Sequence, residues 1–103
     1  MKKQAKPENQ ITIYQTPDGA VNIEVMYASQ NIWLTQKLMA ELFETTPQNI
    51  TLHLKNIYSQ KELDKKATCK DFLQVQKEGE RNVKRYLRYF SLEAIIAVGY
   101  RVN

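Results

Sequence analysis

Amide, hydroxyl and cationic side chains alternate with apolar ones between residues 46 and 57, in a pattern that suits the reading of DNA bases. Thr46 and Pro47 are typical of the first turn of a helix, because the hydroxyl pairs with a backbone N–H and proline lacks one. From there Ile50, Leu54 and Ile57 recur at the helical period and form one apolar face. The opposite face of the predicted helix is polar and available to a ligand.

This polar face carries residue types that pair with base edges. Glutamine and asparagine can form two hydrogen bonds with adenine, and threonine or leucine can contact the methyl group of thymine. A helix about 10–12 Å across also fits the major groove of B-DNA, which is roughly 12 Å wide. We expect Lys55 to bind one phosphate and the helix start at Thr46 to hold another. The predicted base-reading residues are Gln48, Asn49, Thr51 and Leu52.

A second group of cations lies on a predicted β-hairpin, whose strands span residues 72–76 and 83–90 and whose tip is at Gly79. Strand alternation sends Lys84, Tyr86 and Arg88 to one face, which is basic and carries a ring suited to stacking on sugar. Such a hairpin, or wing, can lie along phosphates or enter the minor groove. The predicted phosphate-binding residues of the wing are Arg81, Lys84, Arg85 and Arg88.

The remaining reactive side chains do not form a catalytic or metal-binding set. His53 is the only histidine and lies near the boundary of the apolar helix face, and Cys69 is the only cysteine. A lone thiol cannot form an internal disulfide or a paired-thiol zinc site. Lys65, Lys66 and Lys70 are expected to favour the thiolate of Cys69, but an ordinary unpaired thiol is the stronger expectation. We predict no enzymatic activity, no cofactor, no metal ion and no small-molecule substrate.

The composition of the 103-residue chain is that of one small globular domain, with 43% apolar and 25% charged residues. No apolar run approaches the roughly 20 residues that cross a bilayer, so we expect no membrane contact and a cytoplasmic protein. The net charge of +4 is unevenly distributed. Residues 1–45 hold four lysines and five acids, whereas residues 46–103 hold eleven lysines or arginines and six acids. This basic excess is compatible with double-stranded DNA as the partner.

Two helices in succession position the predicted base-reading face. The first is capped by Thr35 and runs to Phe43, and the second runs from Thr46 to about Tyr58. A short break between two helices is the arrangement of a helix-turn-helix. Residues 59–70 are charged and are predicted to be a loop.

The other predicted elements are two hairpins and a last helix. Residues 11–27 form a β-hairpin around a Thr-Pro-Asp-Gly turn over residues 16–19, after a flexible leader over residues 1–10. The last helix is capped by Ser91 and runs to about Gly99. The predicted fold class is α+β, with an N-terminal β-hairpin plus a winged helix-turn-helix-like domain, forming a single domain over residues 11–103.

Several short segments resemble the RhuM virulence protein family. The resemblance covers the chain from about residue 11 to its end. It is carried by residues 13–16, 32–36, 40–43, 49–50 with 53–57, 62–64 and 97–103. The most specific parts are Trp33-Leu34-Thr35-Gln36 and Val98-Gly99-Tyr100-Arg101-Val102-Asn103. The resemblance implies a bacterial, virulence-associated DNA-binding protein of a mobile element or pathogenicity island. It implies no catalytic residues. Family members continue beyond the closing motif, which implies the N-terminal part of a longer protein or a truncated gene.

Other interpretations of the same residues stay open. The polar helix face is also what a solvated helix presents, and an exposed Leu52 is also typical of a packing contact or a dimer surface. Alternating cations also protect an exposed edge strand from aggregation. Besides transcriptional regulation through DNA, the sequence is compatible with a protein-interaction module or with a targeting arm for a C-terminal region. A homodimer would allow paired half-sites on DNA.

Overall fold

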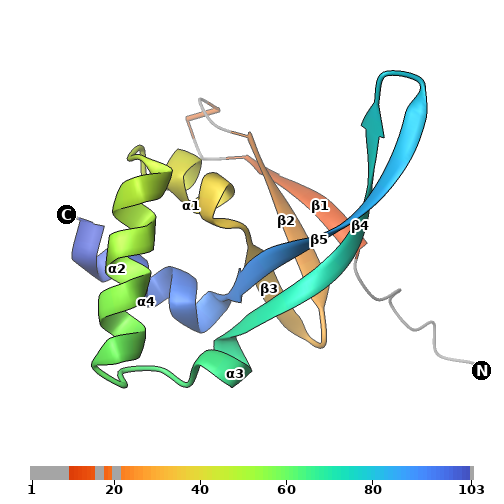
Figure 1. The fold of residues 1–103 in the computed structure, drawn as a ribbon. Coiled ribbons are helices and arrows are strands. Elements are labelled where there is room, and N and C mark those ends of the chain that lie inside the picture. The colour runs from red at the N-terminus through yellow and green to blue at the C-terminus, as the bar shows by residue number, and fades with distance from the viewer. Residues whose placement is uncertain (1–9, 16–17, 20–21, 103) are drawn as a thin grey trace, which may run out of the picture.

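The computed structural model describes residues 10–15, 18–19 and 22–102, and these form an α+β fold (Figure 1). The elements follow in the order β1 (Gln10–Gln15), β2 (Asn22–Ala28), β3 (Asn31–Leu34), α1 (Gln36–Leu42), α2 (Pro47–Ser59), α3 (Lys65–Thr68), β4 (Cys69–Glu78), β5 (Arg81–Ser91) and α4 (Leu92–Val102). None of the described helices is long and apolar enough to cross a membrane. The α+β class predicted from the sequence is confirmed.

All five strands belong to one antiparallel sheet, in the order β1-β2-β3-β5-β4. The predicted N-terminal hairpin is confirmed as β1 and β2, and Gln10 belongs to β1 rather than to the leader. Residues 1–9 of the predicted leader lie outside the described residues, as do residues 16–17 of the predicted turn. In the middle of the sheet β3 pairs with both β2 and β5, so the strand that precedes α1 lies beside the strand that precedes α4.

The strand β3 was not predicted as a strand, because its turn lacks the usual signals. Ser29 and Gln30 connect β2 to β3, and both have positive φ angles, of 52° and 56°. Two successive positive φ values are those of a type I′ hairpin turn, which normally contains asparagine and glycine. The Ser-Gln turn lacks these residues, so its sequence does not indicate the hairpin of β2 and β3.

Apolar side chains pack on both faces of the sheet. The larger cluster lies between the sheet and the helices, and its buried members are Ile23, Leu34, Met39, Ala40, Ile50, Leu54, Ile57, Phe90, Ala94, Ile95, Ala97 and Val98. A smaller cluster on the other face consists of Met26, Ala28, Trp33 and Tyr89, with Phe72 and Leu87 against it. Trp33 is anchored there, because its indole Nε1 donates to the carbonyl of Ala28 at 2.8 Å. The sheet is therefore fixed from both sides near β3.

The segment predicted as a loop over residues 59–70 contains an additional short helix, α3, and the first two residues of β4. Asp64 begins α3, because its Oδ1 accepts the backbone N–H of Lys66 at 3.1 Å. Thr68 ends it as a buried residue. A single helical turn is too short to display an apolar period, so the sequence pattern did not reveal it.

The last helix begins at Leu92 as predicted but is capped differently and runs three residues farther, to Val102 rather than Gly99. Ser91 is the buried last residue of β5, and its hydroxyl accepts no backbone N–H within the described part of the chain. Instead Asn31 reaches α4 from the start of β3, where its Oδ1 accepts from the N–H of Leu92 at 3.4 Å. Its Nδ2 donates to Glu93 Oε1 at 3.3 Å. The start of the last helix thus depends on a residue about sixty positions away.

Candidate nucleic-acid interface

The helices α1 and α2 form the predicted pair, separated by residues 43–46. Both predicted caps are confirmed: Thr35 Oγ1 accepts from the N–H of Leu38 at 3.2 Å, and Thr46 Oγ1 accepts from the N–H of Asn49 at 3.1 Å. The break closes on α1 because the N–H of Thr45 donates to the carbonyl of Ala40 at 2.9 Å. The angle between the two helices is therefore held by backbone as well as side-chain bonds.

The two faces of α2 are divided as the periodicity predicts. Ile50, Leu54 and Ile57 are buried against the core, and the opposite face is open to solvent. Leu52 is 54% exposed there, far more than a leucine that is packed in the core. The exposed members of this face are Gln48, Thr51, Leu52, Lys55 and Ser59.

Two of the predicted base-reading side chains already have partners within the protein. Asn49 is half-buried, and its Nδ2 donates to Thr45 Oγ1 at 2.9 Å. The hydroxyl of Thr51 donates to the carbonyl of Pro47 at 3.0 Å and accepts from the amide of Gln36. Among the described residues Gln48 makes no side-chain hydrogen bond, so it keeps its donors and acceptor for solvent or a ligand.

The predicted second hairpin is confirmed as β4 and β5, with Gly79 at the tip at a φ of +63°. It is longer than predicted and extends past the rest of the sheet as an arm (Figure 1). Arg88 and Phe90 line a pocket together with residues of α2, so their face of β5 is the helix side of the arm. By strand alternation and register, Lys77, Lys84 and Tyr86 belong to the same face. Tyr86 is 71% exposed on it.

The opposite face of the arm carries Arg81 and Arg85 together with Leu87, which packs against the smaller cluster. Arg85 is paired there with Glu78, with an Nη2–Oε2 distance of 2.9 Å. On the helix side Arg88 Nε lies 3.3 Å from Asp71 Oδ1. Two of the predicted phosphate-binding arginines therefore have acidic neighbours, whereas neither Lys55 nor Lys84 forms an ion pair within the described part of the chain.

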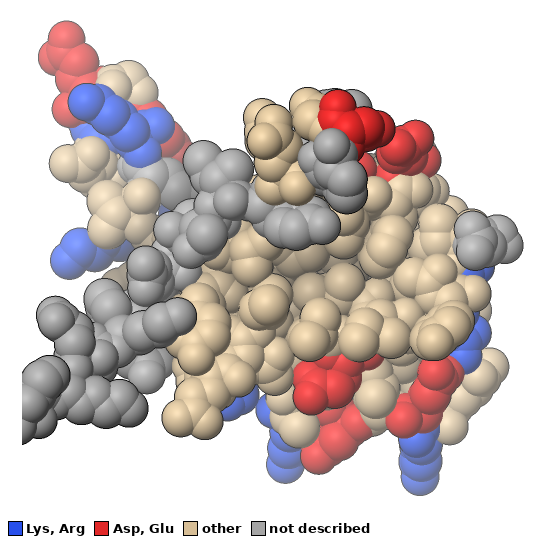
Figure 2. Space-filling model, turned by 180° about the vertical axis from the view of Figure 1, so that it is seen from behind, with Lys and Arg blue, Asp and Glu red and all other residues tan. Residues whose placement is uncertain are grey.

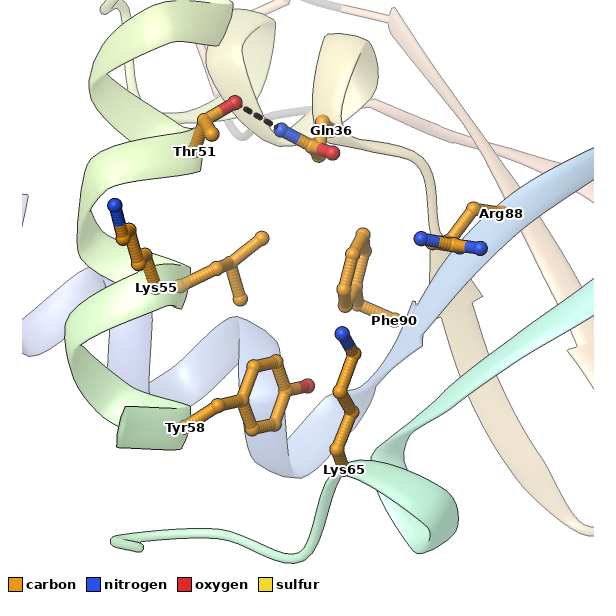
Figure 3. A pocket seen from close by; sticks show the side chains of 8 residues that line it. Gln36, Thr51, Lys55, Tyr58, Lys65, Arg88 and Phe90 are labelled. Carbon is orange, nitrogen blue, oxygen red and sulfur yellow. Dashed lines mark hydrogen bonds between the residues drawn. The ribbon is translucent and has the colours of Figure 1, made fainter. Parts of the chain in front are cut away.

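An open pocket of about 330 Å³ lies between α2, α3 and β5 (Figure 3). The buried side chains of Leu54 and Phe90 form its apolar part. Three cationic side chains surround it, each from a different element: Lys55 from α2, Lys65 from α3 and Arg88 from β5. Sequence reasoning assigned two of them to phosphates but missed Lys65, because the short helix that carries it was predicted to be a loop.

Neither of the two lone reactive residues lines this pocket. His53 is half-buried on α2, as predicted. Cys69 begins β4 rather than lying in a loop, and burial raises the pKa of its thiol although Arg88 and Lys65 act in the opposite direction. Desolvation of the thiolate therefore outweighs the attraction of the cations, which agrees with the ordinary unpaired thiol that was the stronger expectation. No group of three potential metal-ligating side chains occurs among the described residues.

The face opposite to that of Figure 1 has a different character. Figure 2 shows that uncharged side chains fill its centre, while charged ones gather at its margins and on the arm. The helix α4 lies behind α2 in Figure 1 and has a row of exposed apolar residues at every fourth position. Leu92, Ile96 and Tyr100 are 40%, 50% and 83% exposed. The cation-lined pocket and the uncharged centre of the rear face thus offer two different surfaces.

Comparison with known protein families gives a match over part of the chain. The model of the RhuM virulence protein family matches residues 67–103, which confirms over this part of the chain the resemblance seen in the sequence. The match covers the arm and α4, and it leaves out α2 and the Trp33-Leu34-Thr35-Gln36 segment. No curated protein and no solved structure was found to match the chain.

The closing motif within this matched region has a structural explanation. A Cβ atom added to Gly99 would lie 3.2 Å from two ring carbons of Phe43, closer than ordinary van der Waals contact. Val98 is fully buried, and Arg101 forms an ion pair with Glu62. The motif therefore docks α4 against the end of α1 and against the loop that follows α2.

Proposed function

We propose that this chain, whose residues 67–103 match the RhuM family model, is a non-enzymatic DNA-binding protein that acts in transcriptional regulation. In the proposed mode, α2 lies in the major groove and the β4–β5 arm contacts the phosphate backbone as a wing. The observation that carries the proposal is that the two proposed DNA-contacting surfaces lie next to each other. The exposed face of α2 and the basic face of the arm border the same pocket, through Lys55 and Arg88.

The order of elements supports a winged helix-turn-helix arrangement. A strand, β3, precedes the helix pair, and the hairpin that follows the pair returns β5 to the side of that strand. This pairing fixes the base of the arm next to α1 and α2, so that helix and arm have a defined geometry. A rigid placement is what a binding surface for duplex DNA requires, because both contacts must be made in one register.

Exposure supports a division of roles among the predicted contacts. Gln48 and Leu52 are the exposed candidates for base contacts at the start of α2, whereas Asn49 and Thr51 are held by Thr45, Pro47 and Gln36. Lys55 and the cations of the arm suit phosphates. The helix start at Thr46 remains a proposed phosphate contact, because an exposed N-terminus offers N–H groups to an anion.

The first test is the salt dependence of binding to mixed-sequence duplex DNA, measured by fluorescence anisotropy. If about five phosphates are neutralised, the logarithm of the binding constant falls with the logarithm of the salt concentration with a slope of roughly −4 to −5. A slope steeper than about −3 supports the phosphate contacts. Absence of binding even at low salt contradicts the proposed function.

A second test separates base contacts from backbone contacts. The preferred site is first selected from a pool of random duplexes. Gln48→Ala is then expected to relax discrimination at one base pair by about 1–3 kcal/mol, whereas Lys84→Ala weakens binding to all sequences alike. Ser59→Ala, at the other end of the same helix, is the matched control and leaves the preference unchanged. An unchanged preference in Gln48→Ala removes α2 from the proposed base contacts.

A second candidate function, binding of a protein partner, is favoured by the exposed row on α4. Leu92, Ile96 and Tyr100 lie on one side of the helix, and the rear face has few charges at its centre (Figure 2). A second copy of the chain suits this surface, because two molecules of net charge +4 meet with least repulsion where neither is charged. The resulting homodimer would present two copies of α2.

Sedimentation equilibrium tests the homodimer. The wild-type chain is expected to dimerise, and Ile96→Lys is expected to be monomeric because it buries an unpaired charge at the contact. Leu52→Lys, an equally exposed position on α2, is the matched control and remains dimeric. A wild-type chain that stays monomeric over the whole concentration range contradicts the dimer.

A further inference from the structure

The pocket between α2, α3 and β5 combines an apolar base with a cationic rim. Leu54 and Phe90 are 4% exposed and form the base, and Lys55, Lys65 and Arg88 line the pocket with them. Figure 3 shows the ends of the Lys65 and Arg88 side chains turned toward the pocket and the Lys55 side chain rising along α2 at its margin. No carboxylate is among the lining residues that the structure describes. Asp71 contacts Arg88 through Nε alone and from outside the lining. The pocket therefore concentrates positive charge that the protein compensates only in part.

A hydrogen-bonded relay fixes α3, and with it Lys65, against α2. The hydroxyl of Thr68 donates to the carbonyl of Asp64 at 2.8 Å, so its single proton is already used. It must then accept the proton of the Tyr58 hydroxyl, which lies 2.9 Å away. Tyr58 belongs to α2 and Thr68 to α3, so this bond joins the two helices.

The relay also places the amino group of Lys65. The Nζ atom lies 5.9 Å from the centre of the Tyr58 ring, within the range of a cation–π contact. Figure 3 shows the amino group of Lys65 turned toward the pocket, although the residue as a whole is exposed. Within the described part of the chain Lys65 forms no ion pair, so its charge is available to an anion.

We infer that this pocket binds a phosphate group of the DNA backbone, held by Lys65 of α3 together with Lys55 of α2 and Arg88 of β5. The inference rests on the proposed function and adds a contact to it. Three cations from three elements can surround one phosphate, and the apolar base suits the sugar attached to it. A phosphate here joins the base-reading helix to the base of the arm, so both are set in one register on the duplex. A small phosphorylated compound shares this chemistry and is distinguished below.

The test compares two lysines of the same short helix. Lys65 lines the pocket, whereas its neighbour Lys66 is exposed and does not. In Lys65→Ala the slope of log binding constant against log salt is expected to become shallower by about 1, because one phosphate contact is lost. Lys66→Ala is expected to change the slope much less. Equal slopes in the two variants, with DNA binding intact, overturn the pocket while leaving the proposed function in place.

Titration with a nucleoside monophosphate, followed by the amide resonances of residues around the pocket, separates the two sources of phosphate. Tight DNA binding that depends on Lys65, with only millimolar binding of the nucleotide, supports a backbone phosphate. Tight nucleotide binding that Lys65→Ala abolishes, without any DNA binding, overturns the backbone assignment and the proposed function together. Absence of both kinds of binding also overturns both. Far-ultraviolet circular dichroism of each variant checks the fold, and Lys65→Gln provides a second variant of similar size.

Discussion

Arg85 binds Glu78 along one face of the β4–β5 arm, with its Nε and Nη2 atoms at 3.1 and 2.9 Å from the same carboxylate oxygen. Nη2 also contacts the second oxygen at 3.1 Å. Both side chains are about half exposed, so the pair adds little to stability. Its effect is on charge: an arginine that the sequence offers to phosphate is compensated by an acid of the same hairpin, on the face opposite α2.

This pairing predicts unequal effects of two neighbouring cations. Lys84→Ala is expected to make the salt slope of DNA binding shallower by about 1, whereas Arg85→Ala changes it less because Glu78 already neutralises the arginine. Glu78→Gln is expected to strengthen binding at low salt, since it frees the arginine. Anisotropy titrations at several salt concentrations measure all three. Equal slopes for Lys84→Ala and Arg85→Ala would show that the ion pair opens on DNA.

The close approach of Gly99 to Phe43 predicts that a larger side chain at position 99 does not fit between α4 and the end of α1. Gly99→Leu is expected to destabilise the fold by about 1–3 kcal/mol, because the new side chain meets the Phe43 ring. Urea unfolding followed by circular dichroism measures the loss. The double variant with Phe43→Leu is expected to recover part of it, since the smaller partner leaves room. If the losses of stability in the two single variants simply add, the destabilisation does not arise from the contact between residue 99 and Phe43.

The turn between β2 and β3 predicts a stabilising substitution. Gln30 has a φ of 56°, a conformation that glycine adopts without the steric penalty of a Cβ atom. Gln30→Gly is therefore expected to raise the free energy of unfolding by up to about 1 kcal/mol. The control is Lys55→Gly at an exposed position in the middle of α2, which is expected to lower stability by about 1 kcal/mol. A loss of stability in Gln30→Gly contradicts the strain assigned to the turn.

Burial predicts a loss of stability at alkaline pH. Desolvation raises the pKa of the Tyr58 and Tyr89 hydroxyls above their ordinary value of 10.0, and it raises the pKa of the Cys69 thiol above 9.0. These groups therefore lose their protons at lower pH in the unfolded chain than in the folded one. Their contribution to the free energy of unfolding is fully present below pH 9.0 and is lost as the pH rises through the pKa values of the folded state. Urea midpoints at increasing pH measure the decline.

The contribution of a single group to this decline is isolated by substitution. Cys69→Ser removes the earliest ionisation and is expected to delay the loss to higher pH. Tyr58→Phe is expected to lower stability at neutral pH by about 0.5–1.5 kcal/mol, because the bond to Thr68 is lost, and to flatten the dependence above pH 10.0. A decline unchanged in both variants assigns it to other groups.

Much of the local structure follows from neighbours along the chain. Thr35 and Thr46 satisfy the first N–H groups of α1 and α2, and the spacing of Ile50, Leu54 and Ile57 fixes which face of α2 is buried. Gly79 marks the tip of the arm because its positive φ suits the turn. These features depend on contacts a few residues apart, so the sequence reveals them without knowledge of the fold.

The exceptions at the local level share one cause. The strand β3 follows a turn of Ser29 and Gln30, and α3 is a single helical turn begun by Asp64. Neither segment has a residue pattern strong enough to indicate it. Both form because the rest of the protein pairs or packs with them, β3 through β2 and β5 and α3 through the bond between Thr68 and Tyr58.

The sequence by itself determined the order of the elements other than β3 and α3, the polar face of α2 and the excess of cations in the second half of the chain. Only the tertiary structure decided which of those groups meet. The pairing of β3 with β5 brings Arg88 across from Lys55, and α3 adds Lys65 to them. The same folding pairs Arg85 with Glu78 and holds Thr51 against Gln36. Such encounters join residues that are distant along the chain or lie on different strands, and local periodicity carries no information about them.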